Sequence, residues 1–222
     1  MLRKLKGLKF PEEFLTRFFF KEKLFKHKGH VLELGCGNGN NLALFNQFGW
    51  KTTGVDINKK NIENAKFNFR LLKKNTKTSD YLFIQKDMLE YLKNCKLKNI
   101  RCLLFPSSLY YLQENKIIQI FEILSKRQII KKNCSIYFRM RMQDDYRFKK
   151  SKKLKGRTKK ILFEETGEKN CINTFYKKKE FINLLKKYLK LSDMKTMINK
   201  LENYQNDKKI FNSDFVVWGK LK

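Results

Sequence analysis

The sequence predicts an α/β protein with a doubly wound, mostly parallel sheet, and three observations support this fold class. Residues 31–39 read V-L-E-L-G-C-G-N-G, which is a buried strand followed by a glycine-rich turn. Apolar stretches suited to strands then alternate with helical patterns along the chain. Acidic residues stand close after the second and third strands, at the edge of the sheet where such folds bind ligands.

The predicted elements follow in order. Residues 1–28 form an N-terminal helical cap, with helix over residues 2–28 and Pro11 in a first turn. Later helices are marked by apolar residues at helical spacing, and Asn58 is a candidate cap of the second of them. Residues 73–80 form a polar connection. Strands are predicted at residues 31–34, 52–55, 81–85, 100–105 and 135–140, with helices at residues 40–48, 58–72, 88–94 and 114–126 between them.

The pattern changes after the fifth strand. Residues 141–174 are polar, basic and without a clear period, and we interpret them as an insertion on the substrate side of the sheet. A helix and a terminal pair of strands complete a chain whose length suits a single domain over residues 1–222. Short strands are predicted at residues 160–163 and 173–175, the last helix at 178–190, and the terminal strands at 191–199 and 211–220.

Composition limits the function classes. No run of 18 apolar residues occurs, so we expect no membrane span. The five cysteines include no C-x-x-C pair, so neither a disulfide framework nor a metal site is expected, and the protein is predicted to be cytoplasmic. The net charge is +30, and we favour codon usage in an A/T-biased genome as its origin over a polyanion-binding role for the whole surface. Only residues 149–160 concentrate it, as K-K-S-K-K-L-K-G-R-T-K-K.

The glycine-rich turn indicates which cofactor is bound. Dinucleotide folds use G-x-G-x-x-G, whereas this turn has G-x-G-x-G preceded by Glu33 inside the strand. An acidic side chain there repels a pyrophosphate and suits a cationic ligand. The pattern E-x-G-x-G-x-G resembles the first motif of class I S-adenosylmethionine (SAM) methyltransferases, whose ligand carries a sulfonium and an ammonium and no phosphate.

Three further segments resemble the same family in order and spacing. Asp56 ends the second strand, where a carboxylate can accept from both ribose hydroxyls. Asp87 resembles the residue that accepts from the adenine amino group, with Met88 beside the ring. The segment P-S-S-L-Y-Y from Pro106 resembles the family's lining of the methyl-transfer site.

The resemblance implies SAM as cofactor, S-adenosylhomocysteine as product, and a seven-stranded sheet of order 3-2-1-4-5-7-6 with an antiparallel last strand. It also implies a set of cofactor-binding residues from these motifs. They are Glu33, Gly35, Cys36, Gly37, Asn38, Asp56, Ile57, Asp87, Met88 and Pro106.

The methyl acceptor is predicted to bind where the fourth and fifth strands end. Asp145 or Asp144 is the candidate proton acceptor, and Arg147 is the candidate partner of an anionic group. Tyr110 or Tyr111 is the candidate orienting group. The segment around them resembles, more loosely, small methyltransferases encoded in bacterial surface-polysaccharide clusters. The leading hypothesis is therefore methyl transfer to a small anionic acceptor, such as a sugar nucleotide or phosphorylated precursor for a capsule or similar polysaccharide.

Other readings stay open at this point. The charges of residues 139–147 can simply pair with one another in a solvated loop. The basic insertion would suit an RNA or DNA methyltransferase, although neither an N/D-P-P-Y/F signature nor a Pro-Cys pair follows the fourth strand. The chain can also be a SAM-binding partner subunit without activity.

Overall fold

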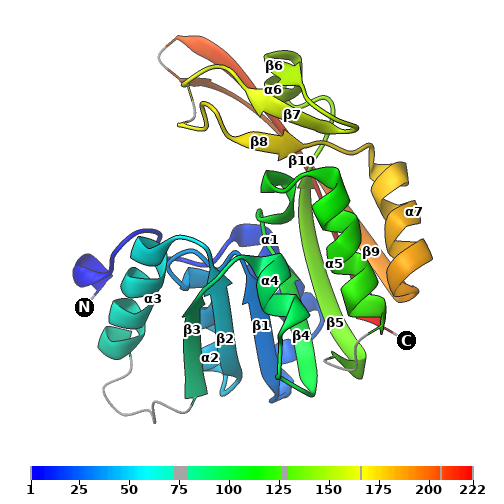
Figure 1. Ribbon diagram of the computed structural model, residues 1–222. Coiled ribbons are helices and arrows are strands. Elements are labelled where there is room, and N and C mark those ends of the chain that lie inside the picture. The colour runs from blue at the N-terminus through cyan, green and yellow to red at the C-terminus, as the bar shows by residue number, and fades with distance from the viewer. Residues whose placement is uncertain (1, 73–79, 127–129, 166, 206, 222) are drawn as a thin grey trace.

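A seven-stranded sheet with helices on both faces forms the body of the protein, and a small lobe stands above one end of it (Figure 1). This computed structural model describes residues 2–72, 80–126, 130–165, 167–205 and 207–221. The strand order is β3-β2-β1-β4-β5-β10-β9, so the predicted order 3-2-1-4-5-7-6 is confirmed. The strands are β1 (His30–Leu34), β2 (Lys51–Asp56), β3 (Tyr81–Gln85), β4 (Ile100–Phe105), β5 (Ile130–Arg141), β9 (Leu191–Gln205) and β10 (Lys208–Leu221).

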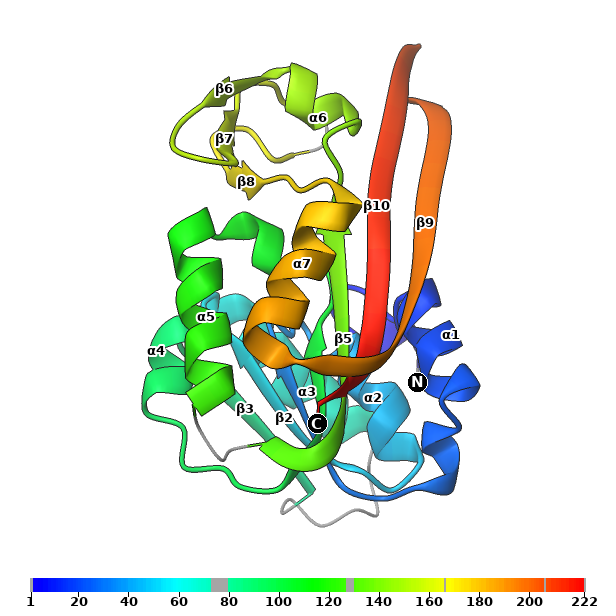
Figure 2. The same cartoon turned by 90° about the vertical axis from the view of Figure 1, so that its right-hand side faces the viewer.

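The first five strands are parallel, and β10 pairs antiparallel with both β5 and β9. Parallel pairing brings the carboxyl ends of β1, β2, β3 and β4 to one edge of the sheet, where ligands bind in such folds. The last two strands are longer than predicted, and their hairpin rises past the body to the level of the lobe (Figure 2).

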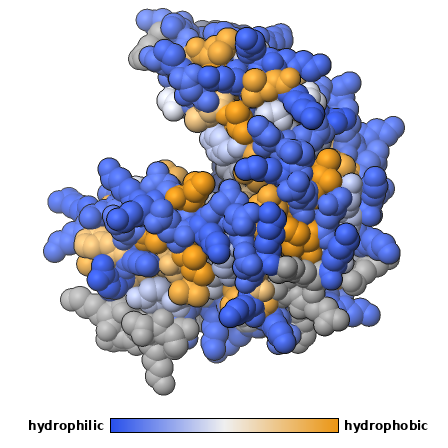
Figure 3. Space-filling view, viewed as in Figure 1, coloured by the Kyte–Doolittle hydropathy of each residue, from blue (hydrophilic) through white to orange (hydrophobic). Residues whose placement is uncertain are grey.

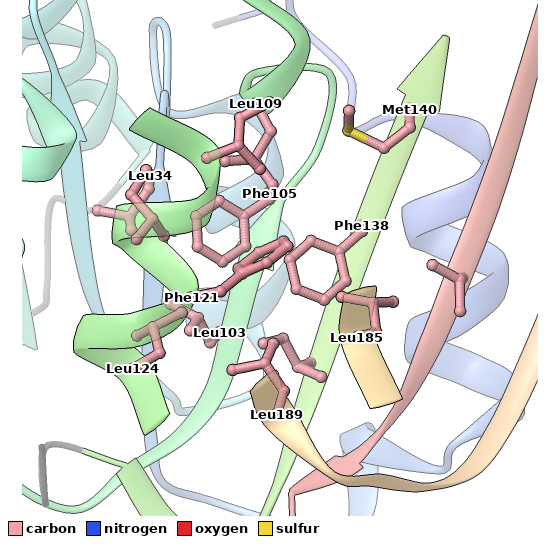
Figure 4. Close-up of a cluster of buried hydrophobic side chains, with 14 of the residues drawn as sticks. Leu34, Leu103, Phe105, Leu109, Phe121, Leu124, Phe138, Met140, Leu185 and Leu189 are labelled. Carbon is pink, nitrogen blue, oxygen red and sulfur yellow. The ribbon is translucent and has the colours of Figure 1, made fainter. Parts of the chain in front are cut away.

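Alternation along the buried strands supplies two separate cores. On β4, Leu103 and Phe105 face one way, and Cys102 and Leu104 face the other. Phe105 stacks on Phe138 of β5 at 5.1 Å between ring centroids, in the cluster drawn in Figure 4. Helices α4 (Met88–Lys93), α5 (Glu114–Lys126) and α7 (Lys178–Leu189) cover this face, and α1 (Glu13–Lys21), α2 (Asn40–Gln47) and α3 (Lys59–Leu72) cover the other.

The prediction of one helix over residues 2–28 is wrong. The segment contains a short 3-10 helix η1 (Leu2–Lys4), an extended stretch, α1, and a second 3-10 helix η2 (Leu24–Lys26). Gly7 has a positive φ of 69°, and Pro11 restricts the residue before it to extended backbone, so no helix can run through this stretch. We call residues 5–12 the N-terminal strap.

The insertion is more ordered than predicted. It holds a helix α6 (Tyr146–Lys149) and a three-stranded sheet of order β6-β7-β8, which together form the lobe. Two of its strands were predicted with boundaries shifted by one or two residues, and β6 was missed because lysines fill it. The strands are β6 (Ser151–Lys153), β7 (Thr158–Ile161) and β8 (Ile172–Thr174).

The predicted connection at residues 73–80 lies outside the described residues except for Asp80. Among the helices that the structure describes, none has the length and apolar character needed to cross a membrane.

Candidate cofactor and acceptor site

Two cavities meet at the glycine-rich turn, in the region where the molecule is hollowed between the lobe and the body (Figure 3). Gly35, Gly37 and Ser107 line both of them. The first cavity, of about 550 Å³, runs from Asp56 and the start of α4 to the underside of the lobe. The second, of about 450 Å³, lies between the turn and the N-terminal strap.

Backbone hydrogen bonds fix the turn against the end of β2. The amides of Gly35 and Cys36 both donate to the carbonyl of Val55, at 2.8 and 3.0 Å. A Cβ on Gly35 would lie 2.4 Å from Ser108, so glycine is required there. Gly37 differs: its φ is +51°, and a Cβ there would meet no atom within 4 Å. Gly37 therefore faces open space at the junction of the two cavities.

Glu33 is a buried carboxylate with one unsatisfied oxygen. Its side chain is 1% exposed, and Oε1 accepts a 2.8 Å hydrogen bond from Asn41. Oε2 is buried with no partner among the described residues. Burial raises the pKa of the Glu33 carboxyl to about 8, against the hydrogen bond from Asn41. A buried oxygen without a partner is unfavourable, and this one belongs to a residue that lines the second cavity, so a cation or hydrogen-bond donor of a ligand would satisfy it.

Two carboxylates lie at the first cavity, and both also accept hydrogen bonds from backbone amides of the protein. Asp56 accepts from the amides of Gly37 and Asn58, each at 2.8 Å. Asp87 caps α4, since Oδ1 accepts from the amides of Leu89 at 2.9 Å and Glu90 at 3.2 Å. Both line the cavity together with Ile57 and Met88, and the cofactor contacts of these four residues stay a prediction.

The segment after β4 carries strain at the junction. Ser107 has a positive φ of 52°, which is unfavourable for a residue with a Cβ. The hydroxyl of Ser108 is buried and has no partner in the part of the chain that the structure describes. Pro106 lines the second cavity. Strained backbone and an unsatisfied polar atom at one place are typical of a ligand site.

Cys36 and Asn38 line the second cavity, but their side chains form hydrogen bonds with backbone carbonyls of the protein itself. Burial raises the pKa of the Cys36 thiol, which excludes a thiolate nucleophile at neutral pH. Asn38 donates to the carbonyls of Lys6 and Leu8, and Asn41 accepts from the amide of Glu12 at 2.8 Å. These asparagine side chains tie the strap over the second cavity.

The strap brings in Glu12, which the sequence analysis missed, beside Arg139 of β5. Glu12 and Arg139 line the second cavity, joined at 2.7 Å between Oε1 and Nη1. Arg139 also pairs with Asp214 at 2.5 Å, and the hydroxyl of Tyr137 lies 3.3 Å from Glu12. Burial raises the pKa of the Glu12 carboxyl, although Arg139 lowers it. The sequence held no signal for Glu12, because the contact spans 127 residues.

The predicted catalytic residues lie away from the cavities. Asp145 is 1% exposed, caps α6, and is held by Arg147 at 3.1 Å and by the amide of Ser213 at 2.9 Å. Asp144 pairs with Lys200 on the β9 hairpin. Tyr110 is buried beneath the guanidinium of Arg141, 4.3 Å from its ring centroid. None of these described residues lines either cavity, whereas the neighbouring Tyr111 lines the first.

A family model described as a methyltransferase domain matches residues 1–122, more than half of the chain. The chain belongs to this methyltransferase domain family. The match covers the strap, the glycine-rich turn and the first four strands, and the matched residues supply all the lining residues of both cavities except Ile172 in the first and Arg139 in the second. No curated protein matches the sequence.

Solved structures similar to this methyltransferase share its fold at low identity. A SAM-dependent methyltransferase from Archaeoglobus fulgidus is 17% identical with a TM-score of 0.62, over 98% of this chain and 96% of that one. The N-terminal domain of EvdMO1, solved with S-adenosylhomocysteine, is 16% identical with a TM-score of 0.64, over 96% and 83%. The Burkholderia thailandensis 1,6-didemethyltoxoflavin-N1-methyltransferase is 11% identical with a TM-score of 0.60, over 95% and 77%.

The prediction of a class I SAM-dependent methyltransferase is thereby confirmed, and SAM is its cofactor. The site of this methyltransferase fits that molecule. The unsatisfied oxygen of Glu33 suits an ammonium, and the open space at Gly37 admits a ligand close to backbone. The resemblance to polysaccharide-cluster enzymes stays a prediction.

Proposed function

We propose that this methyltransferase transfers the methyl group of SAM to a small acceptor that carries an anionic group. The observation that supports this proposal most directly is the junction of two cavities at Gly35, Gly37 and Ser107. One cavity offers Asp56 and Asp87 to a ribose and an adenine, and the other offers Glu33 to an ammonium. The acceptor would meet the cofactor at this junction.

The protein has little chemistry to perform, because the sulfonium of SAM supplies an activated methyl group. Its residues must hold the acceptor in line with that group and exclude water. The strap and the segment after β4 enclose the second cavity for this purpose. A hydroxyl or amine acceptor also needs a proton acceptor. Glu12 is better placed for that role than Asp144 or Asp145, because it lines the cavity and burial raises its pKa.

Asp145 and Arg147 would then act as positioning residues rather than catalytic ones. Arg147 also pairs with Glu168, which accepts from the hydroxyl of Tyr111 on the cavity wall. Substitution of Asp145 or Arg147 would thus affect methyl transfer by changing the shape of the first cavity. A surface-polysaccharide precursor remains part of the proposal on the sequence resemblance alone, and a cytoplasmic location remains part of it on the cysteine pattern.

A nucleic-acid substrate is the second candidate, and the lysine-rich β6–β7 segment of the lobe favours it. The two candidates differ in what they methylate. Incubation of the purified chain with SAM labelled in its methyl group, and with separate pools of phosphorylated metabolites and total RNA, distinguishes them. We expect label in the metabolite pool.

Calorimetry tests the cofactor before any acceptor is known. We expect S-adenosylhomocysteine to bind and NAD not to bind, because an ammonium can satisfy the buried Oε2 of Glu33 and a pyrophosphate cannot. Binding of NAD without a response to S-adenosylhomocysteine would contradict the assignment. Binding of S-adenosylhomocysteine with no label transfer to either pool would instead support a SAM-binding subunit without activity.

A further inference from the structure

Lysine side chains form a row across one face of the lobe sheet. Lys152 of β6 is directly opposite Lys160 of β7, and Lys160 is directly opposite Ile172 of β8. Residues directly opposite in an antiparallel pair share a face, with Cβ atoms about 5 Å apart. Ile172 lines the first cavity. The row Lys152–Lys160–Ile172 therefore leads from the edge of the lobe to the wall of the cofactor cavity.

Hydrogen bonds show that this face is turned toward the body. Thr158, two residues before Lys160, shares its face. Its hydroxyl lies 2.8 Å from that of Thr174 and accepts from the amide of Glu114 on α5 at 3.1 Å. Thr174 donates to the carbonyl of Leu112 at 2.6 Å. The lobe thus rests on the body by the face that carries Lys160, and Lys152 continues that face to the edge strand β6.

The charges on this hairpin oppose its folding. Lys152 faces Lys160, and Lys153 faces Lys159, so two like-charged pairs stand directly opposite. Such pairs destabilise a sheet. No Asp or Glu occurs between residues 146 and 163 to offset them. Within the described residues Lys152 and Lys160 have no ion pair, and the same is true of Lys116, which lines the first cavity together with Ile172.

We propose that Lys152, Lys160 and Lys116 bind a phosphate or pyrophosphate group of the methyl acceptor. This inference rests on the proposed function, which it deepens by naming the group that is recognised. An anion between the lobe and α5 neutralises lysines that repel one another in the free protein. It also places the acceptor's other end toward the junction of the cavities, because Ile172 and Lys116 line the same cavity as Gly35 and Ser107.

Calorimetry of the full chain, saturated with S-adenosylhomocysteine and titrated with inorganic pyrophosphate, tests the proposal. The variant Lys152→Gln with Lys160→Gln removes two charges from the row. The control Lys153→Gln with Lys155→Gln removes two charges from the same hairpin: Lys153 belongs to the opposite face, and Lys155 lines a separate cavity beside α5. We expect the first variant to weaken pyrophosphate binding about tenfold or more and the control by about twofold.

Every outcome of this titration bears on the proposal. Equal losses in both variants, or no binding to the unsubstituted chain, would overturn it. A single-stranded RNA oligonucleotide that binds far more tightly than pyrophosphate, with the same dependence on the row, would assign the row to a nucleic acid instead. Failure of S-adenosylhomocysteine to bind would contradict the proposed function and is detected in the saturation step, before pyrophosphate is added.

Discussion

The hydroxyl of Tyr111 donates a hydrogen bond of 2.5 Å to Oε1 of Glu168, and this contact joins the wall of the cofactor cavity to the lobe. Glu168 also accepts from Arg141 at 2.8 Å and pairs with Arg147. The carboxylate is thus shared by two buried guanidinium groups and one phenol. The lobe therefore takes part in shaping the cavity, although it lies outside the segment that matches the family model.

Replacement of Glu168 by Gln should lower the free energy of unfolding by about 3 kcal/mol, because Arg141 and Arg147 lose the charge that compensates their burial. Chemical denaturation measures this loss. Glu164→Gln is the matched control, since its pair with Lys169 is exposed and is worth at most about 0.5 kcal/mol. A Glu168 variant as stable as the control would mean that the buried network contributes nothing.

The stability that Glu168 provides should depend on pH. Burial by itself would raise the pKa of the Glu168 carboxyl, but Arg141, Tyr111 and Arg147 together lower it from 4.5 to about 2. A lowered pKa in the folded state means that the contribution is complete above pH 4.5 and is lost as the pH falls toward 2. Denaturation at several pH values should show a steeper decline over this interval in the unsubstituted chain than in Glu168→Gln.

Glu33 should release a proton when the cofactor binds. Its pKa of about 8 in the free protein, caused by burial, leaves the carboxyl mostly protonated at pH 7. An ammonium beside Oε2 favours the ionised form, so S-adenosylhomocysteine should displace up to about one proton. Calorimetry in buffers of different ionisation enthalpy measures that number. Glu33→Gln should bind more weakly and release none; unchanged proton release in this variant would assign the proton to another group.

Glu33 also makes the stability of the free protein depend on pH, with a sign opposite to that of Glu168. Because the folded pKa of Glu33 lies above the ordinary 4.5, the free protein loses stability as the pH rises from 4.5 toward 8. Glu33→Gln should remove this decline and be the more stable protein near pH 8 without ligand. The observation would show that Glu33 is kept for binding at a cost in stability.

The sequence was informative where function depends on local spacing. Three features follow predicted strands within a few residues: the turn over residues 35–39, Asp56 and Asp87. The strand pattern and the spacing after each strand were therefore enough to locate them. The acceptor side depends on contacts between distant segments. Glu12 pairs with Arg139, which lies 127 residues later in the sequence. Asp145 accepts a hydrogen bond from the amide of Ser213, which lies 68 residues later. Nothing in the local pattern of D-D-Y-R distinguishes a buried ion pair from a catalytic one.

Substitution of Gly37 by Ala should separate the turn's backbone strain from its role in binding. The φ of +51° makes any Cβ unfavourable by about 1 kcal/mol, and the added methyl group would occupy the open space at the junction. Gly167→Ala is the control: its φ is +68°, its Cβ also meets no atom within 4 Å, and it lines neither cavity. Both variants should lose similar stability in thermal unfolding, but only Gly37→Ala should lose affinity for S-adenosylhomocysteine, by about tenfold or more. Equal affinity in the two would mean that the ligand does not approach this turn.

Asp87 allows capping and adenine recognition to be measured separately. In Asp87→Asn, Oδ1 can keep both hydrogen bonds from Leu89 and Glu90, so helix α4 keeps its cap and stability should change by less than about 0.5 kcal/mol. The other carboxylate oxygen becomes an amide donor, which cannot accept from the adenine amino group. Affinity for S-adenosylhomocysteine, measured by calorimetry, should therefore fall by about 1–2 kcal/mol. Asp87→Ala should lose the same affinity and about 1 kcal/mol of stability as well.

Asp56→Ala should weaken binding by about 1–3 kcal/mol through the ribose hydroxyls. If Asp87→Asn binds as tightly as the unsubstituted chain while Asp56→Ala does not, the ribose site is correct and the adenine lies elsewhere in the first cavity.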